Sequence, residues 1–572
     1  MAEAPTETKA QRVERLKRSK NPWESLEEIR RFAREGFGSI PPEWTGTYFR
    51  WWGVYTQGDG AGVTGGKSGE GRAVECFMVR IQIPNGLLRS EQLRTIADLT
   101  RRYAHGIADI SVRQNIQLHW VTIEALPEVL EALWRVGLNT RTCGDVTRNV
   151  TGCPVAGVDA DEICDPSPLA LEATHMLSGN ADFYNLPRKF KISITGCRVW
   201  CPYPEINDIG LTAITRMAHG VPEVGFSLRV AGGLSTEPHL GVRLNAFVGW
   251  HQVLPTLKGI AELFRDSEVL REHRERARLK FLFLRQGWTA ERFQDELQQR
   301  IGFQFDPAEA EEAPADAYRD HVGIHPQKQP GYCYVGAAVL RGRITAEQMH
   351  AAADLADRFA AGELRTTIMQ NLLIVNVPQA SAEGLAKELD TIGLSVGGST
   401  FWRGAIACSG TEFCKLAITE TKSFARWLVE ELEERLPGFD QQLKLHVTGC
   451  PNSCGQHWIA DIGIDGKKMK VEGRLVDAYY FCLGGALGLY QATARAVGYR
   501  CPATEVPDAI ERLLRRYLTR RAAGENLRQF FARHTDAELR EFLAGEALGA
   551  VPRDLPPVSV GRSPQYAGVD GD

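Results

Sequence analysis

The chain has 572 residues, of which 43% are hydrophobic and 24% charged, and its formal net charge is −4. A chain of this length exceeds one hydrophobic core and is expected to form roughly two to four domains. The charge balance disfavours a nucleic-acid-binding protein, for which a strongly basic domain is expected. The charged N-terminus is unlike a secretory signal, and no apolar stretch reaches the roughly 18 residues of a membrane span. These features predict a cytoplasmic protein with no membrane association.

Strand and helix patterns alternate along the first part of the chain. Residues 77–83 predict a strand that ends at the turn 84–86. Residues 90–103 carry apolar side chains at helical spacing behind a predicted cap at Ser90. A strand within 110–122 and a helix over 127–136 follow. Such alternation indicates an α+β or α/β protein.

The chain also repeats itself once. Five short motifs of the first half recur in the same order in the second half, at a nearly constant offset. The matched positions are Asn115 with Asn371, Cys153 with Cys408, Cys197 with Cys450, Asp208 with Asp461, and Gly233 with Gly485. The acidic, Pro- and Ala-rich segment 305–317 lies between the halves and predicts a linker. The series indicates gene duplication.

The cysteines of the second half are the strongest chemical signal. Cys408 and Cys414 form a C-x5-C motif, and Cys450 and Cys454 form a C-x3-C motif. Four thiolates in two close pairs can hold Zn²⁺ or an iron–sulfur cluster. Structural zinc favours two to four residues between paired ligands, so the longer spacer favours the cluster. An amphipathic helix is predicted to run from Cys414 to Leu436, which would place the site on a rigid element.

These motifs, in the second of two duplicated halves, resemble the assimilatory nitrite and sulfite reductase family. Three further segments carry the resemblance: 77–80 (Phe-Met-Val-Arg), 143–148 (Cys-Gly-Asp-Val-Thr-Arg) and 186–191 (Leu-Pro-Arg-Lys-Phe-Lys). The resemblance covers roughly residues 50–542. It implies a six-electron reductase of sulfite or nitrite that contains siroheme and a [4Fe–4S] cluster.

The resemblance also implies a fold with pseudo-twofold symmetry, in which two ferredoxin-like halves join two α/β domains that embrace the cofactors. The expected divisions are then an N-terminal wrapping segment (1–70), a first ferredoxin-like half (71–140), a first α/β reductase domain (141–304), a linker (305–320), a second ferredoxin-like half (321–400), a second reductase domain with the cluster (401–550) and a flexible tail (551–572).

Residue roles follow by the same resemblance. The four cysteines Cys408, Cys414, Cys450 and Cys454 bind the cluster, and Cys454 shares its thiolate with the siroheme iron. A small oxyanion needs fixed positive charge and proton donors, which Arg and Lys provide. The implied catalytic residues are Arg80, Arg148, Lys189 and Lys191. Arg80 is expected on an otherwise apolar strand, and Lys189 and Lys191 are expected on one face of a short strand that runs into Ile194. Residues expected near siroheme carboxylates or the cluster are Arg113, Gln114, Asn115, Gln117 and Asn452. The glycine pairs 232–233 and 484–485 either approach the macrocycle or serve packing.

The sequence favours neither anion strongly. Lysine at both Lys189 and Lys191 resembles sulfite reductases, because plant-type nitrite reductases have Lys-x-Asn there. Segments 83–86 and 148–157 instead resemble bacterial proteins that are usually called nitrite reductases. No G-x-G-x-x-G motif opens a helix after a strand, so electrons are expected from reduced ferredoxin or a separate flavoprotein. The enzyme is expected to be a monomer.

Two other functions stay open at this point. A related cluster oxygenase of corrinoid biosynthesis would not need the Arg and Lys set. A non-catalytic electron carrier or zinc-stabilised binding protein would need neither those cations nor a macrocycle.

Two hypotheses concern the remaining cysteines of the first half. Cys153, Cys197 and Cys201 are either relics of the duplication or part of a second metal site completed by Cys143 or Cys164. Separately, Tyr55 and Cys143 could form a thioether crosslink near the distal pocket.

Overall fold

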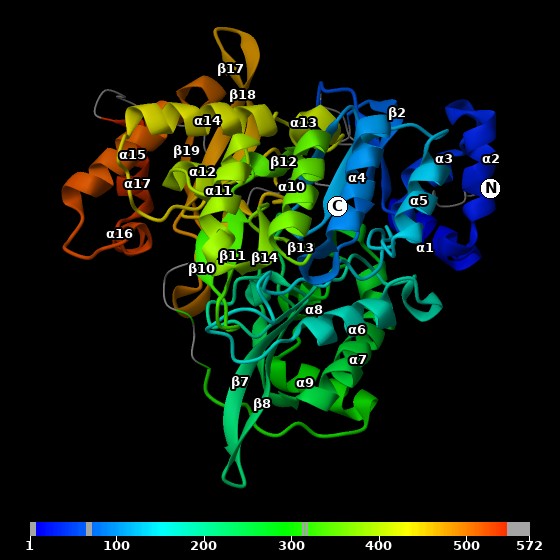
Figure 1. The fold of residues 1–572 in the computed structure, drawn as a ribbon. Coiled ribbons are helices and arrows are strands. Elements are labelled where there is room, and N and C mark those ends of the chain that lie inside the picture. Colours follow the sequence, from blue (N-terminus) through cyan, green and yellow to red (C-terminus); the bar gives the residue numbers. More distant parts are fainter. Residues whose placement is uncertain (1–6, 64–70, 312–313, 315–318, 546–572) are drawn as a thin grey trace.

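The computed structural model describes residues 7–63, 71–311, 314 and 319–545 (Figure 1). Within these residues the strands form four sheets, two in the expected ferredoxin-like halves and two in the regions that follow them. No helix in the described ranges has the length and apolarity needed to cross a membrane.

The N-terminal region packs onto the first ferredoxin-like half. It contains α1 (Lys9–Ser19), α2 (Leu26–Glu35) and α3 (Pro42–Gly46). The rings of Phe32, Trp44 and Phe49 meet edge to face in the largest hydrophobic core, and Phe49 reaches Phe77 of the first sheet. This aromatic contact fixes the segment that leads into the first strand.

The two ferredoxin-like halves exchange one strand each. The first sheet has the order β1 (Val54–Gly58), β2 (Ala73–Ile81), β5 (Ile116–Val121), β4 (Ile107–Ile110), β12 (Arg343–Thr345). The second has the order β10 (Gly323–Pro326), β11 (Tyr332–Ala337), β14 (Leu372–Pro378), β13 (Glu363–Thr366), β3 (Leu87–Arg89). Thus β12 of the second half completes the first sheet and β3 of the first half completes the second. The predicted duplication and ferredoxin-like halves are confirmed.

Helices cover these two sheets in matching positions. Helix α4 (Ser90–Tyr103) packs against α10 (Ala346–Phe359), and the two lie side by side in Figure 1. The companion helices are α5 (Leu126–Arg135) and α11 (Ala382–Thr391). Arg94 of α4 pairs with Asp354 and Asp357 of α10 across the contact. The predicted helix over 90–103 is present, although Arg89 and not Ser90 occupies its N-cap position.

A reciprocal pair of glutamines clamps the halves together. Gln114 donates from Nε2 to the Thr366 carbonyl at 3.0 Å, and Gln370 donates from Nε2 to the Ile110 carbonyl at 2.9 Å. Both glutamines have left-handed backbone conformations, with φ of 61° and 63°. The duplicated Gln-Asn pairs therefore mark the contact between the two sheets.

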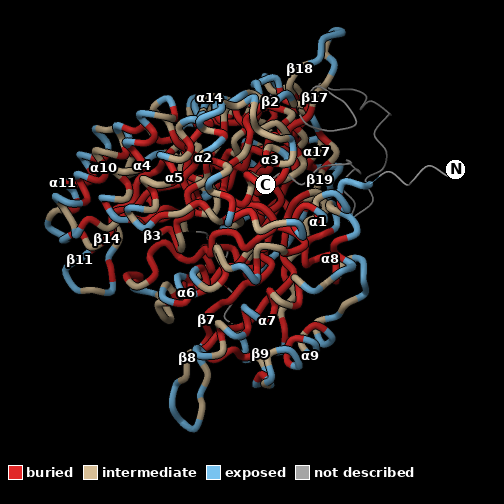
Figure 2. The backbone as a smooth tube through the Cα atoms, turned by 90° about the vertical axis from the view of Figure 1, so that its right-hand side faces the viewer, coloured by how far each residue is buried: buried red, intermediate tan, exposed pale blue. Residues whose placement is uncertain are grey.

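The first reductase region forms the four-stranded sheet β6 (Ile192–Thr195), β7 (Ile209–Ala218), β8 (Val221–Val230), β9 (Val242–Gly249). Its helices are α6 (Ser167–Leu177), α7 (Val253–Arg265), α8 (Lys280–Gln286) and α9 (Ala290–Ile301). Strands β6 and β7 are parallel, and the later pairs are antiparallel. The tip of the β7–β8 hairpin projects from the body and is exposed (Figure 2).

The second reductase region repeats this plan with one more strand. Its sheet has the order β15 (Ala405–Ala407), β16 (Leu445–Thr448), β17 (Ile462–Val471), β18 (Arg474–Leu483), β19 (Arg495–Pro502). Its helices are α12 (Thr400–Gly404), α13 (Gly410–Phe413), α14 (Lys422–Arg435), α15 (Val506–Arg520), α16 (Leu527–Arg533) and α17 (Asp536–Ala544). Strand β15 pairs parallel with β16, and β16 pairs parallel with β17.

Two local predictions are wrong. The helix expected from Cys414 begins only at Lys422, because residues 414–421 form turns whose Ala417 and Ile418 amides donate to the carbonyls of Cys414 and Gly449. Lys189 and Lys191 do not lie within the strand, since β6 begins at Ile192.

The predicted linker is partly attached to the first reductase region. Asp306 accepts a backbone hydrogen bond from Phe247, and Glu311 forms an ion pair with Arg229 at 2.5 Å. The tail predicted from residue 551 lies outside the described residues.

Candidate functional site

The cysteines of the second half gather at one edge of a sheet. Cys408 follows β15, and Cys450 and Cys454 follow the neighbouring parallel strand β16. The carboxyl ends of parallel neighbours lie at the same edge, so the two motifs meet there. Cys414 follows the short helix α13, and all four residues line one cavity.

The surroundings of these thiols suit an iron–sulfur cluster. The Gly449 amide lies 3.3 Å from Cys408 Sγ, and a Cβ at Gly449 would lie 2.8 Å from the Thr419 carbonyl. Burial raises the pKa of Cys414 to about 12 and that of Cys450 well above its ordinary value. Thiols in such surroundings become thiolates when bound to metal ions, and backbone amides directed at sulfur tune the potential of a cluster.

The four predicted catalytic cations line the same cavity as the cysteines. Burial raises the pKa of Cys454, while the positive charges of Lys189, Lys191 and Arg80 act in the opposite direction. The Cys454 thiol therefore lies close enough to these cations to feel their charge. The structure brings the predicted cluster ligands and the predicted anion site together.

Arg80 is held on β2 by its neighbours. It lies opposite Gln117 of β5, and with its amide oxygen turned toward the guanidinium Gln117 accepts from Nε and Nη2 at 3.1 and 2.9 Å. The Nη1 atom lies 2.9 Å from Cys143 Sγ, and the guanidinium carbon lies 5.5 Å from the centre of the Tyr55 ring. These contacts fix the orientation of the Arg80 guanidinium.

Arg148 is oriented by its own loop. Its Nη1 donates to the carbonyls of Gly144 at 2.8 Å and Thr142 at 3.3 Å, and its side chain is 4% exposed. Its backbone amide donates to the Phe190 carbonyl at 2.7 Å. That bond joins the Arg148 loop to the segment that carries Lys189 and Lys191.

Burial, together with nearby like charges, lowers the pKa of two cations in the cavity. Burial and the nearby cations Arg278, Arg113 and Lys189 place the pKa of Lys191 well below its ordinary value. Burial and Arg148 lower the pKa of Arg113 to about 9. A lysine with a depressed pKa is a better proton donor than a solvated one.

The residues expected near the cofactors divide into two groups. Arg113, Asn115, Gln117 and Asn452 line the cavity, and the Nε atom of Arg113 is buried with no hydrogen-bond partner. Cationic and amide donors of this kind fit the many carboxylates of siroheme. Gln114 does not line the cavity, because its side chain donates to the Thr366 carbonyl and accepts from the Gly152 amide at 3.1 Å.

The glycine pairs serve close backbone packing. A Cβ at Gly232 would lie 2.3 Å from the Glu205 carbonyl, and one at Gly485 would lie 2.6 Å from the Trp458 carbonyl. The packing role foreseen for these glycines has direct structural support.

Sequence reasoning missed several residues that line the cavity. Arg278 pairs with buried Asp208 at 2.8 Å and comes from an irregular segment before α8, where no motif marks it. The His119 ring stacks on Phe413, next to Cys414, with ring centroids 3.6 Å apart. His119 also contacts buried Asp109 at 3.0 Å. Its alternating strand pattern indicated burial but not this stack.

The first half contains a second cysteine group at the corresponding sheet edge. Cys153 and Cys201 lie with His321, and Cys197 lies next to Cys201. Neither Cys143 nor Cys164 belongs to the group of Cys153, Cys201 and His321, in which Cys197 is not included either. Cys143 contacts Arg80 instead.

The sequence matches the family "Nitrite and sulphite reductase 4Fe-4S domain" over residues 143–305 and 398–550. It matches the "Nitrite/Sulfite reductase ferredoxin-like half domain" over residues 70–135 and 325–392. Both families therefore occur twice, in agreement with the duplication.

Similar proteins extend over nearly the whole chain. The "Assimilatory ferredoxin-dependent nitrite reductase" of Haloferax mediterranei is 37% identical, over 88% of this chain and 88% of that protein. The "Sulfite reductase [ferredoxin]" of Mycobacterium tuberculosis is 36% identical, over 92% and 95%. A solved structure, the Mycobacterium tuberculosis NirA protein, has a TM-score of 0.87 at 36% identity, over 92% of this chain and 97% of that chain. The chain belongs to the nitrite and sulfite reductase family, whose duplicated [4Fe–4S] domain and ferredoxin-like half domain it contains.

Proposed function

We propose that this chain is an assimilatory, ferredoxin-dependent reductase of nitrite or sulfite. The observation that carries this proposal is that Cys454 lines the same cavity as Lys189, Lys191 and Arg80. A redox centre and an anion-binding site are useful together only if electrons pass to a bound anion. An electron carrier without a substrate would have no need for buried cations at its cluster.

The cysteines and the cations have separate roles. Cys408, Cys414, Cys450 and Cys454 would hold the [4Fe–4S] cluster, and Arg113, Asn115, Gln117 and Asn452 would contact siroheme or the cluster surroundings. The cluster and siroheme supply one-electron transfers and an iron centre for the anion. A corrinoid-pathway oxygenase has no support among the similar proteins, which are named as nitrite and sulfite reductases.

Arg80 and Arg148 bind and orient the oxyanion. Each guanidinium offers a planar set of N–H donors that matches two oxygen atoms of nitrite or sulfite. Cys143 and Gln117 hold Arg80 in place, and the carbonyls of the Arg148 loop hold Arg148. Fixed donors in a buried site stabilise developing negative charge more strongly than water does.

Lys189 and Lys191 provide protons as oxygen atoms leave as water. They flank Phe190, whose carbonyl accepts from the Arg148 amide. The lowered pKa of Lys191, which burial and the neighbouring cations cause, favours release of its proton to the substrate.

Reduced ferredoxin is the proposed electron donor. Several similar proteins are named as ferredoxin-dependent enzymes, including the "Ferredoxin--nitrite reductase" of Synechococcus elongatus, which is 36% identical over 90% of this chain. A separate flavoprotein is the alternative donor. We further propose a monomer that acts in the cytoplasm and has the domain divisions given above.

A spectroscopic and kinetic experiment tests the function. The purified protein should show siroheme absorption, and turnover with reduced ferredoxin should convert nitrite to ammonia or sulfite to sulfide. Cys454→Ser should change the visible spectrum and abolish turnover, whereas Cys501→Ser, at a buried thiol outside the cavity, should change neither. A colourless holoprotein, or a Cys454→Ser variant with normal spectrum and rate, would refute the proposal.

A further inference from the structure

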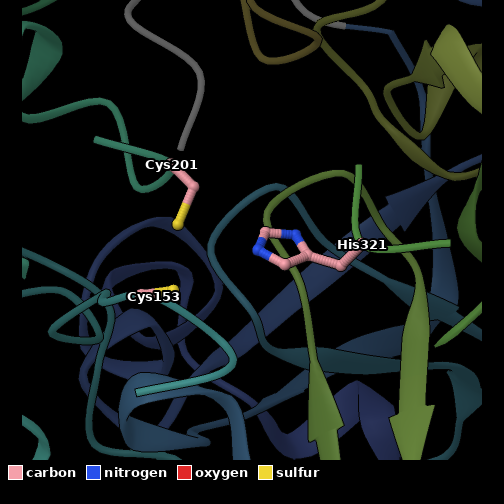
Figure 3. A group of neighbouring side chains, drawn as sticks. All are labelled: Cys153, Cys201 and His321. Carbon is pink, nitrogen blue, oxygen red and sulfur yellow. The ribbon is translucent and has the colours of Figure 1, made fainter. Parts of the chain in front are cut away.

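The second cysteine group of the first half has the geometry of a site for one metal ion. One donor atom each of Cys153, Cys201 and His321 lies within 4.8 Å of the others, and all three residues are buried. Cys197 is not one of the three residues that meet this limit, but its Sγ lies 3.2 Å from the Sγ of Cys201, and it is the proposed fourth donor. In Figure 3 the Cys201 thiol and the His321 imidazole point into the same space.

His321 is the observation that points to a ligand. Its side chain is 2% exposed, and neither ring nitrogen makes a hydrogen bond of ordinary geometry. A buried imidazole with two unsatisfied nitrogens carries a substantial desolvation cost. Its backbone has a left-handed conformation with φ of 63°, which is uncommon for a residue other than glycine. Coordination of a metal ion would satisfy one of these nitrogens.

The backbone is built to hold this histidine in place. Gly336 of β11 packs so closely that a Cβ there would lie 1.8 Å from the His321 carbonyl. Asp320, the preceding residue, forms an ion pair with Arg403 at 2.8 Å. The position of His321 is therefore supported from two sides, by a strand and by a salt bridge.

The cysteine spacing and distances favour zinc over an iron–sulfur cube. Cys197 and Cys201 form a C-x3-C pair, which lies within the range typical of structural zinc. Zinc–sulfur bonds of about 2.3 Å at tetrahedral angles place ligand atoms roughly 3.8 Å apart, which lies within the 4.8 Å limit that Cys153, Cys201 and His321 meet. In a [4Fe–4S] cluster each thiolate binds a different iron atom, so the cysteine sulfurs would have to lie farther apart.

Polar and charged groups surround the sulfurs, as they do around the ligands of a metal site. The Cys201 amide lies 3.3 Å from Cys197 Sγ, and Thr195 Oγ1 lies 3.1 Å from the same sulfur. Arg319 pairs with Asp159 near the group, and its positive charge acts on Cys153 and Cys201. Three thiolates, one neutral imidazole and Zn²⁺ carry a net charge of −1, which a nearby guanidinium stabilises.

We propose that Cys153, Cys197, Cys201 and His321 bind one structural Zn²⁺ ion, separate from the cluster site. Binding replaces three thiol protons, which pass to solvent, with one divalent cation, and no electron is transferred. Cys153, Cys197 and Cys201 belong to the first reductase region, whereas His321 lies two residues before β10 of the second ferredoxin-like half. The ion would thus tie the two halves of the duplicated chain together.

The apolar neighbours of the group support this bridging role. Cys153, Cys197 and Cys201 share a hydrophobic cluster with Tyr334 of β11 and with two residues of β14. Four protein ligands leave no open coordination position, so the site would be structural and not catalytic.

Element-specific measurements on the holoprotein test the proposal. Protein from zinc-supplemented cells should contain about one zinc per chain, and its zinc X-ray absorption should show three sulfurs at about 2.3 Å and one nitrogen at about 2.0 Å. Cys201→Ser should lose most of the zinc, and His321→Gln should weaken zinc retention against a chelator by about tenfold or more. Both variants should keep the visible absorption of the cluster and siroheme.

Matched controls separate ligand loss from general damage. Cys333→Ser alters another buried thiol, and His325→Gln alters a nearby histidine whose Nε2 contacts the Val322 carbonyl. Both controls should retain zinc. Wild-type protein without zinc or another divalent ion beyond its cofactor iron would overturn the proposal, as would zinc that persists in both ligand variants. An intact mass two hydrogens lower, restored by reductant, would show a Cys197–Cys201 disulfide and would also overturn it.

Discussion

Arg80 contacts two residues that lie far apart in the sequence. Its Nη1 atom lies 2.9 Å from the Cys143 sulfur, and its guanidinium lies over the Tyr55 ring. Because Arg80 is proposed to bind the anion, its neighbours determine where its charge points. Cys143 is therefore a positioning residue, independently of whether it reacts with Tyr55.

Cys143→Ala should raise the KM for the anion more than it lowers kcat. Loss of a hydrogen bond to a charged group costs about 1.4 kcal/mol, which corresponds to about a tenfold change in KM. Steady-state rates with reduced ferredoxin measure both constants. Cys76→Ala, on the same strand but outside the cavity, should leave them unchanged. Equal kinetics in the Cys143→Ala and Cys76→Ala variants would contradict the positioning role.

An intact-mass measurement tests the hypothesis of a thioether between Tyr55 and Cys143. A Tyr55–Cys143 crosslink would lower the intact mass of the wild-type chain by two hydrogens, and Cys143→Ala would abolish that deficit. The contacts of both residues with Arg80 place them around one side chain. A wild-type mass without the deficit removes the hypothesis and leaves the positioning role intact.

Lys191→Asn should shift the preference of the enzyme from sulfite toward nitrite. Sulfite carries more negative charge than nitrite, so loss of one buried cation weakens sulfite binding more. We expect the ratio of kcat/KM for nitrite to that for sulfite to rise about tenfold, which corresponds to about 1.4 kcal/mol. Lys191→Arg keeps the charge and should keep the wild-type ratio. An unchanged ratio in Lys191→Asn would show that the second lysine does not select the anion.

The parts of the site that could be predicted from the sequence are those whose residues lie close together along the chain. Cys408, Cys414, Cys450 and Cys454 were recognisable because each pair is close in sequence, and the repeat located both pairs in the second half. The helix over Ser90–Tyr103 was predictable from its apolar period. Local rules suffice where the residues that act together are also neighbours in the chain.

Features that depend on long-range contacts were not predictable in this way. His321 joins Cys153 and Cys201 only through the tertiary fold, and its left-handed backbone follows no local motif. Arg278 reaches the cavity from an irregular segment. Gln114 was expected near the cofactors, but its pairing with Thr366 depends on the exchange between the two sheets. A single sequence does not encode these partners in its spacing.

Lys17 of α1 should be a strong anchor for the N-terminal segment. Its ammonium group is fully buried and donates to Asp145 at 3.2 Å and to the Leu186 carbonyl at 2.8 Å. Asp145 lies in the segment that carries Arg148. Lys17→Ala should therefore destabilise the protein by about 3 kcal/mol, because it leaves buried acceptors without a partner. Differential scanning calorimetry should show a lower apparent Tm, and turnover should fall as well.

Arg18→Ala provides the matched control on the same helix. Arg18 pairs with Glu268 at 3.6 Å, and its side chain is 64% exposed. Exposed ion pairs add little stability, so this variant should match the wild-type Tm and rate. A similar loss in both variants would mean that any change in α1 disturbs the fold and that the buried contacts of Lys17 have no special role.

Two buried histidines of the second reductase region should make the protein acid-sensitive. Burial lowers the pKa of His446 to about 3 and that of His457 to about 3. The unfolded chain takes up these protons near pH 6.5, whereas the folded chain does so only near pH 3. Between those values the unfolded state binds more protons, so stability falls as pH falls, by about 1.4 kcal/mol per pH unit for each histidine.

His446→Gln should reduce this acid sensitivity. His446 Nδ1 donates to the Gln456 carbonyl at 3.1 Å, and a glutamine amide can also donate to that carbonyl but does not titrate. From pH 6.5 to pH 5 the wild type should lose about 2 kcal/mol more than the variant, which corresponds to a difference of a few degrees in apparent Tm. Calorimetry at a fixed scan rate across this range measures the difference. His219→Gln, at an exposed position after β7, should keep the wild-type slope, and a His446→Gln slope equal to wild type would show that His446 is protonated in the folded protein.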